Sequence, residues 1–72
     1  MDEYNRILIE EYCRKSKTKK AQFLWRLLEA SYGYDVDLSD ADALELSKLI
    51  KRERSREMKE ALEDLDRYLF EG

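Results

Sequence analysis

The chain has 72 residues, a formal net charge of −3 and a charged fraction of 43%. A chain of this length buries only about 60% of the surface that its unfolded form exposes, so we expect residues 1–72 to form one domain with a small core. The single cysteine, Cys13, excludes an internal disulfide, and the lack of histidine argues against a zinc site. Abundant Glu, Lys and Arg with only two amides give a thermophile-like composition.

No residue pattern in the chain points to catalysis. There is no histidine base, no glycine-rich phosphate loop, and no serine or cysteine with an activating partner. The acids Asp35, Asp37 and Asp42 have the spacing of a calcium loop, but Leu46 occupies the position of its closing glutamate. We therefore expect a protein that is not an enzyme and holds no metal and no cofactor.

The N-terminus has neither a charged leader nor an apolar run long enough for export or membrane insertion. An unpaired cysteine suits a reducing compartment. These features predict a cytoplasmic protein without a membrane partner.

The first predicted element is a helix from about Asp2 to Arg14. Apolar residues recur at helical spacing, and acidic residues occupy the first turn, where the helix dipole favours them. The triplet Ile7, Leu8 and Ile9 is also typical of a strand, so a short strand over residues 4–9 remains an alternative.

The second predicted helix begins after Thr18, a suitable N-cap, and ends at Tyr32, because Gly33 favours the left-handed conformation that stops a helix. Lys19 and Lys20 lie in its first turn, where the helix dipole disfavours positive charge. Either another role requires these charges, or nearby acids neutralise them.

A third helix is predicted to begin after Ser39, which forms a capping-box pattern with Asp42. Its apolar pattern stops at Ile50, and seven residues without an apolar side chain follow before the pattern resumes at Met58. Because nearly all of these residues are strong helix formers, we expect one long C-terminal helix; a break with Ser55 capping a fourth helix is the alternative. The predicted fold class is all-α, a small bundle of three or, with the break, four helices.

The second helix has a wider apolar surface than one neighbouring helix can cover. Its apolar positions span about 220°, roughly twice the arc of an ordinary surface helix. Either the helix lies between two neighbours, or part of this surface contacts a partner through aromatic anchors. The candidate partner-binding residues are Phe23, Trp25, Leu27 and Tyr32.

Charge is strongly segregated along the chain. Every ionisable residue between positions 35 and 45 is acidic, and every one between positions 14 and 26 is basic. The basic residues are candidate contacts to nucleic acid or to an acidic partner, or else they form a solvated connector neutralised by the acidic segment. They are Arg14, Lys15, Lys17, Lys19, Lys20 and Arg26.

Together these features predict a helical protein-protein interaction module: an accessory subunit, adaptor or inhibitor that docks on a larger protein, itself able to handle nucleic acid. Self-association and a self-assembling structural protein are further alternatives. The order of a strand over residues 4–9 and helices from Thr18 and Ser39 is similar to that of the ribbon-helix-helix repressors. This resemblance implies a dimeric DNA-binding protein, although neither face of the strand presents the polar row that base reading requires.

Overall fold

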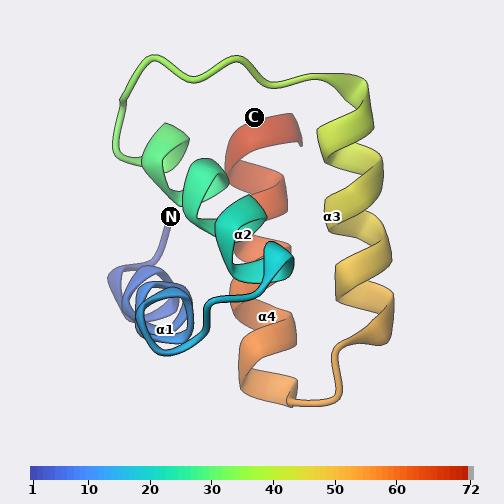
Figure 1. Ribbon diagram of the computed structural model, residues 1–72. Coiled ribbons are helices and arrows are strands. Elements are labelled where there is room, and N and C mark those ends of the chain that lie inside the picture. Colours follow the sequence, from blue (N-terminus) through green and yellow to red (C-terminus); the bar gives the residue numbers. More distant parts are fainter. Residues whose placement is uncertain (72) are drawn as a thin grey trace.

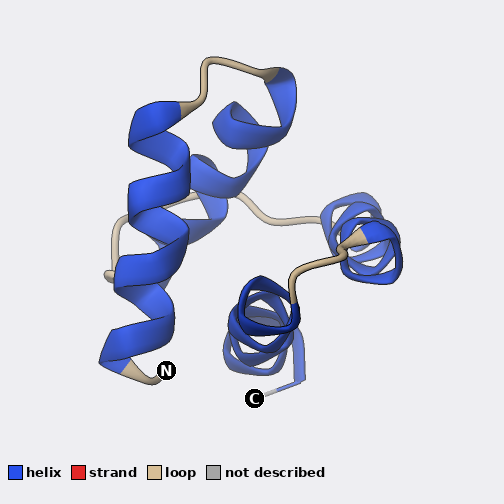
Figure 2. Ribbon diagram, turned by 90° about the horizontal axis from the view of Figure 1, so that it is seen from below, coloured by secondary structure: helices blue, strands red, loops and turns tan. Residues whose placement is uncertain are grey.

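The computed structural model describes residues 1–71, and all regular structure in this range is helical (Figure 1, Figure 2). The prediction of an all-α chain is therefore confirmed. The elements in chain order are α1 (Glu3–Lys15), α2 (Lys19–Ser31), α3 (Asp40–Arg52), α4 (Arg56–Asp66) and a final π-helical segment η1 (Arg67–Glu71). None of the described helices is both long and apolar enough to cross a membrane.

Helix α1 begins at a well-formed cap. The Asp2 side chain accepts a hydrogen bond from the Tyr4 backbone N–H at 2.8 Å, and Glu3 adds a second negative charge to the first turn. Arg14 and Lys15 lie in the last turn, where positive charge is favourable. Residues 4–9 are therefore helical, and the alternative of a strand there is wrong.

Helix α2 begins and ends close to its predicted limits. The Thr18 hydroxyl accepts a hydrogen bond from the Ala21 N–H at 3.1 Å. At the other end, Gly33 has a φ of +93°, a conformation that side-chain-bearing residues rarely adopt. The chain leaves the helix there and runs through a loop to Ser39, which caps α3. The Ser39 hydroxyl accepts the Asp42 N–H and the Asp42 carboxylate accepts the Ser39 N–H, as expected for a capping box.

The prediction of one long C-terminal helix is wrong, because the chain reverses direction at residues 53–55 (Figure 1). Ser55 caps α4 by accepting a hydrogen bond from the Met58 N–H at 3.2 Å. The Glu53 carboxylate accepts the Ser55 N–H at 3.0 Å and approaches Lys20 Nζ of α2 at 3.3 Å. These side-chain hydrogen bonds and the ion pair stabilise the turn at residues 53–55, although the local residues by themselves favour a helix.

Burial explains why the break is preferred over continuity. Leu46 and Leu49 of α3 and Leu62 and Leu65 of α4 all belong to one core. A continuous helix would rise about 1.5 Å per residue and would carry the second pair away from the first. The reversal brings both apolar stripes onto the same interior, so tertiary packing overrides local helix propensity.

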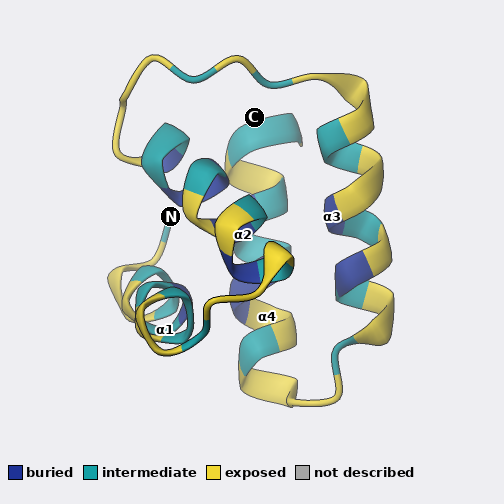
Figure 3. Cartoon of the chain, viewed as in Figure 1, coloured by how far each residue is buried: buried dark blue, intermediate teal, exposed yellow. Residues whose placement is uncertain are grey.

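Helices α3 and α4 run side by side in opposite directions, and α1 lies across α4 (Figure 1, Figure 2). Helix α2 packs on α1, and α3 packs on α4 but has little close backbone contact with α2. Buried residues occur on all four α-helices, whereas the 33–39 loop is mostly exposed (Figure 3). The core consists of Ile9, Leu24, Leu27, Leu28, Leu46, Leu49, Ala61, Leu62 and Leu65.

Candidate functional site

Three exposed aromatic side chains gather on one side of the molecule. Trp25 and Tyr32 project from α2 and Tyr34 follows in the loop, with exposed fractions of 39%, 46% and 66%. Together with Glu10 of α1 and Glu29 of α2 they line a shallow pocket of about 430 Å³, which we call the aromatic patch. Trp25, Glu29 and Tyr32 are separated by four and three positions, which places them on one face of the helix.

Tyr32 is held in place by its neighbours. Its hydroxyl donates to Glu10 Oε1 at 3.0 Å, and the Arg6 guanidinium lies over its ring at 4.8 Å from the centroid. Arg6 is fixed in turn by donating to the Ser31 carbonyl at 3.3 Å. Partial burial, with the hydrogen bond to Glu10, raises the pKa of Tyr32 above its usual value. A ring fixed in this way loses little freedom when it binds a partner.

Gly33 sets the position of Tyr34. Its positive φ turns the chain back, so that the Tyr34 N–H donates to the Glu29 carbonyl at 3.2 Å. Tyr34 therefore stays close to the C-terminal end of α2 in space. Within residues 1–71 the Glu29 carboxylate itself has no hydrogen bond or ion pair, in contrast to Glu10, which pairs with Arg14 at 2.5 Å.

The structure separates the four predicted partner-binding residues. Trp25 and Tyr32 lie together in the aromatic patch. Phe23 instead lines a second groove of about 540 Å³ between α2 and α3, opposite Leu49. Leu27 is fully buried in the core, so its assignment to a partner-binding surface is corrected: the leucine fills the space between α2 and its neighbours.

Three of the six predicted basic contact residues form ion pairs within the protein itself. Arg26 Nη2 lies 2.5 Å from Asp42 Oδ1, and its Nη1 donates to the Asp37 carbonyl at 3.0 Å, which fastens the loop and α3 to α2. Lys20 pairs with Glu53 and lies 5.2 Å from the centre of the Tyr12 ring. The third, Arg14, pairs with Glu10 of its own helix.

Acidic neighbours thus explain how α2 tolerates Lys20 in its first turn. The other three basic residues are exposed and form no ion pair within the described part of the chain. We call them the exposed lysines: Lys15, Lys17 and Lys19. None of them lines the aromatic patch, but Lys19 lines the groove that contains Phe23.

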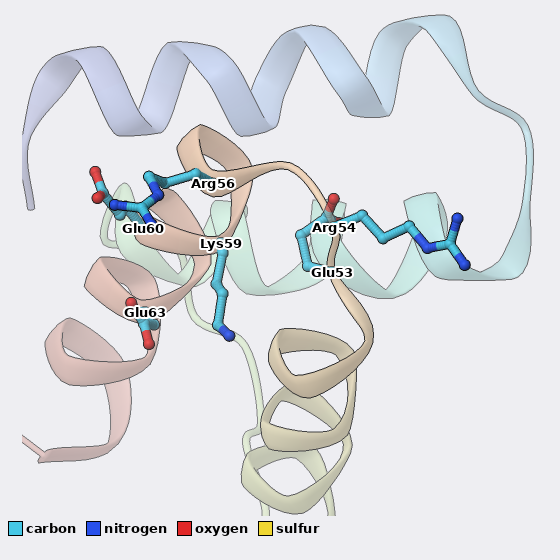
Figure 4. Close-up of a pocket in the computed structure, with 6 residues that line it drawn as sticks. All are labelled: Glu53, Arg54, Arg56, Lys59, Glu60 and Glu63. Carbon is cyan, nitrogen blue, oxygen red and sulfur yellow. The ribbon is translucent and has the colours of Figure 1, made fainter.

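A third depression, of about 390 Å³, lies along the α3–α4 turn and α4 (Figure 4). Three acidic and three basic side chains line it, and Arg54 extends away from the others. Opposite charges alternate without a net excess and without an apolar floor, which is typical of a solvated helix surface. Its residues are Glu53, Arg54, Arg56, Lys59, Glu60 and Glu63.

Sequence reasoning missed Glu10, Glu29 and Tyr34. Glu29 lies one helical turn after Trp25, so helical spacing could have placed it among the candidate binding residues. Tyr34 could have been included as well, because a residue directly after the Gly33 stop stays near the end of the helix. Only the packing of α1 on α2 brings in Glu10. The comparisons with known proteins add no further residues: no protein-family model matches this chain, and no curated protein or solved structure is detectably similar to it.

Proposed function

We propose that this chain is a small, non-catalytic protein-protein interaction module that docks on a larger protein through the aromatic patch. The observation that carries this proposal is the set of three exposed aromatic rings, Trp25, Tyr32 and Tyr34, which line one pocket and of which Tyr32 is held by Glu10 and Arg6. Trp and Tyr at such positions contribute much of the binding free energy of protein interfaces.

The hydrophobic core is complete without these three rings. On the same helix, Leu24, Leu27 and Leu28 are fully buried and supply the contacts between α2 and the rest of the molecule. The aromatic patch therefore lies outside the set of residues that closes the fold, and its apolar area is available to a partner. An accessory subunit, adaptor or inhibitor uses a surface of this kind.

Weak contact with nucleic acid is a second candidate function, supported by the exposed lysines. They form an unneutralised positive surface next to Arg52, which lines the same groove as Lys19 and forms no ion pair within the described residues, whereas Arg14 and Lys20 are paired. Such a surface attracts phosphate without reading sequence. The ribbon-helix-helix arrangement is not retained, because residues 4–9 belong to α1 and supply no strand.

The test is binding of substituted chains to a partner captured by the wild-type protein from its native host. We expect Trp25→Ala to weaken binding by tens of fold, because the loss of an interface aromatic costs about 2 kcal/mol or more. Tyr34→Ala, at a more exposed loop position, is expected to weaken binding while leaving the thermal unfolding temperature within a few degrees of wild type.

The matched controls are Tyr68→Ala and Leu44→Ala, which remove exposed apolar side chains from other surfaces. Both are expected to bind like wild type. Unchanged binding by both Trp25→Ala and Tyr34→Ala, with a folded protein, would show that the docking surface lies elsewhere.

A further inference from the structure

We propose that the aromatic patch binds an arginine side chain carried by a segment of the partner protein. In this arrangement the guanidinium stacks on Trp25 and Tyr34 and pairs with the Glu29 carboxylate. The inference rests on the proposed function, since it assigns a chemistry to the surface through which the protein docks.

The charge around the patch favours a cationic occupant. Two carboxylates and three rings line the pocket, and no Lys or Arg does. Arg14 already neutralises Glu10, whereas Glu29 is unpaired within the described residues, and the exposed Asp35 follows Tyr34 directly in the chain. Aromatic faces attract cations, and a neighbouring carboxylate strengthens this attraction.

The protein itself contains one example of the contact. Arg6 lies over the Tyr32 ring at 4.8 Å from the centroid while one of its nitrogens donates to the Ser31 carbonyl at 3.3 Å. One face of Tyr32 is thus already covered by a guanidinium. Trp25 and Tyr34 have no such cation within residues 1–71, so their faces are the ones available to a partner's arginine.

Arginine fits this site better than the other candidate groups. Its planar guanidinium can stack on a ring and donate two parallel hydrogen bonds to a carboxylate, which the ammonium of lysine cannot do. A nucleic-acid base could also stack on the rings, but the phosphates of the nucleic acid would meet the negative charge of Glu29, which lines the pocket.

Trp25 provides a direct readout, because it is the only tryptophan in the chain. The probe is the peptide acetyl-Gly-Ser-Gly-Arg-Gly-Ser-Gly-amide, and its control has citrulline, a neutral group of the same shape, in place of arginine. We expect the arginine peptide to change Trp25 emission with a dissociation constant on the order of 1 mM at low salt, as befits a single side-chain contact. Citrulline and lysine peptides should bind at least about fivefold more weakly.

The carboxylate is tested with Glu29→Gln, which keeps the size and hydrogen-bonding shape of the side chain. We expect it to weaken arginine-peptide binding by about five- to tenfold, whereas Glu45→Gln, in the groove between α2 and α3, should leave it unchanged. In nuclear magnetic resonance spectra of the wild-type protein, the largest shifts should fall on Trp25, Glu29 and Tyr34.

The outcomes separate this inference from the proposed function. Equal binding of the arginine and citrulline peptides, no effect of Glu29→Gln, or tighter binding of oligothymidylate at Trp25 would each overturn the arginine assignment. If the arginine assignment fails but Trp25→Ala still weakens binding to the captured partner, the proposal of docking through the patch stands. Only the assigned chemistry of the bound group is then wrong. If neither the peptide nor the partner depends on Trp25, both proposals fail.

Discussion

The carboxylate of Asp42 stabilises the protein in two ways. It accepts the Ser39 backbone N–H at 2.9 Å, which completes the capping box of α3, and it pairs with Arg26 of α2. The hydrogen bond from Arg26, with that from Ser39, holds the pKa of Asp42 below its usual range. The charged form is therefore more favourable in the folded protein than in the unfolded chain.

This shift predicts a loss of stability in acid. Because the folded pKa of Asp42 is lowered, its contribution is fully present above the unfolded value of about 4 and disappears as the pH falls through the folded value. Asp42→Asn should lower the free energy of unfolding at pH 7 by about 1 kcal/mol, since the pair is partly exposed. The difference from wild type should shrink toward pH 2, as followed by urea denaturation.

Asp40→Asn is the matched control, because Asp40 lies in the same first turn but forms no ion pair within the described chain. Its effect should be smaller, a few tenths of a kcal/mol from the helix dipole alone. A difference between Asp42→Asn and wild type that is the same at pH 2 and pH 7 would contradict the assigned role of the charge.

Cys13 is predicted to be a slow nucleophile. Partial burial, with a contribution from the negative charge of Glu10, raises the pKa of the thiol to about 11. The thiolate is the reactive form, so at pH 8 its reaction with an aromatic disulfide reagent should be on the order of a hundredfold slower than that of glutathione. Urea should restore a rapid reaction; rapid reaction of the folded protein would contradict the burial of this side chain.

At the scale of the elements, the turn between α3 and α4 gives the sharpest test. Ser55→Ala removes the acceptor of the Met58 N–H and should lower the free energy of unfolding by about 1 kcal/mol. Thermal or urea denaturation measures the loss. Ser47→Ala, inside α3, is the control and should be neutral or slightly stabilising, because alanine is the better helix former. If both substitutions have the same effect, Ser55 does not act as a cap.

The limits of sequence-based prediction can be seen at this turn. The caps at Thr18 and Ser39 and the stop at Gly33 were predictable, because each depends on bonds within a few residues. The break at Ser55 depends instead on the burial of two apolar stripes in one core and on the long-range pair of Lys20 with Glu53. Helix propensities summed over neighbouring residues include neither this burial nor this ion pair.

In the candidate site, too, local sequence predicts some features and tertiary packing determines the others. Helical spacing predicts that Trp25 and Tyr32 share a face, but it cannot tell which part of a wide apolar arc the neighbouring helices cover. Packing places Leu27 in the core, Phe23 in a separate groove, and Glu10 of α1 beside Tyr32.

For the molecule as a whole, the exposed lysines and the acidic loop lie toward different ends, whereas Arg26 of the basic segment pairs with Asp42 of the acidic one. The α1–α2 and α3–α4 connections lie at one end, joined by the pair of Lys20 and Glu53, and this end carries the exposed lysines. The loop with Asp35 and Asp37 lies toward the opposite end (Figure 1). An approaching charged partner would therefore be oriented before contact.

Replacing all three exposed lysines with alanine tests the role of the basic end. If each contacts one phosphate, the substitution should reduce the salt slope of binding to a 20-base-pair DNA duplex by up to about 2.7, at about 0.9 per contact. The measurement is fluorescence anisotropy between 20 and 200 mM salt. Stability should change by less than about 0.5 kcal/mol, because these side chains are exposed.

Lys20→Ala serves as the contrast, because this lysine is paired with Glu53 across the fold. It should lower the thermal unfolding temperature and change the salt slope little. DNA binding that is unaffected by the triple substitution would show that the exposed lysines are only a solvated connector.

The attachment of α3 has a consequence for how the protein opens. This helix rests mainly on α4 and is joined to α2 by two ion pairs, Arg26 with Asp42 and Lys20 with Glu53. Screening by salt weakens such pairs, so α3 should detach in a partial unfolding event before the rest of the molecule. Amide hydrogen exchange should become faster in α3 than in α1 as salt rises from 0.05 to 0.5 M, and equal acceleration everywhere would contradict this order. Because α1 and α2 hold Glu10, Trp25 and Glu29, that part of the aromatic patch should stay in place when α3 opens. Phe23 and Leu49 would then be exposed to solvent.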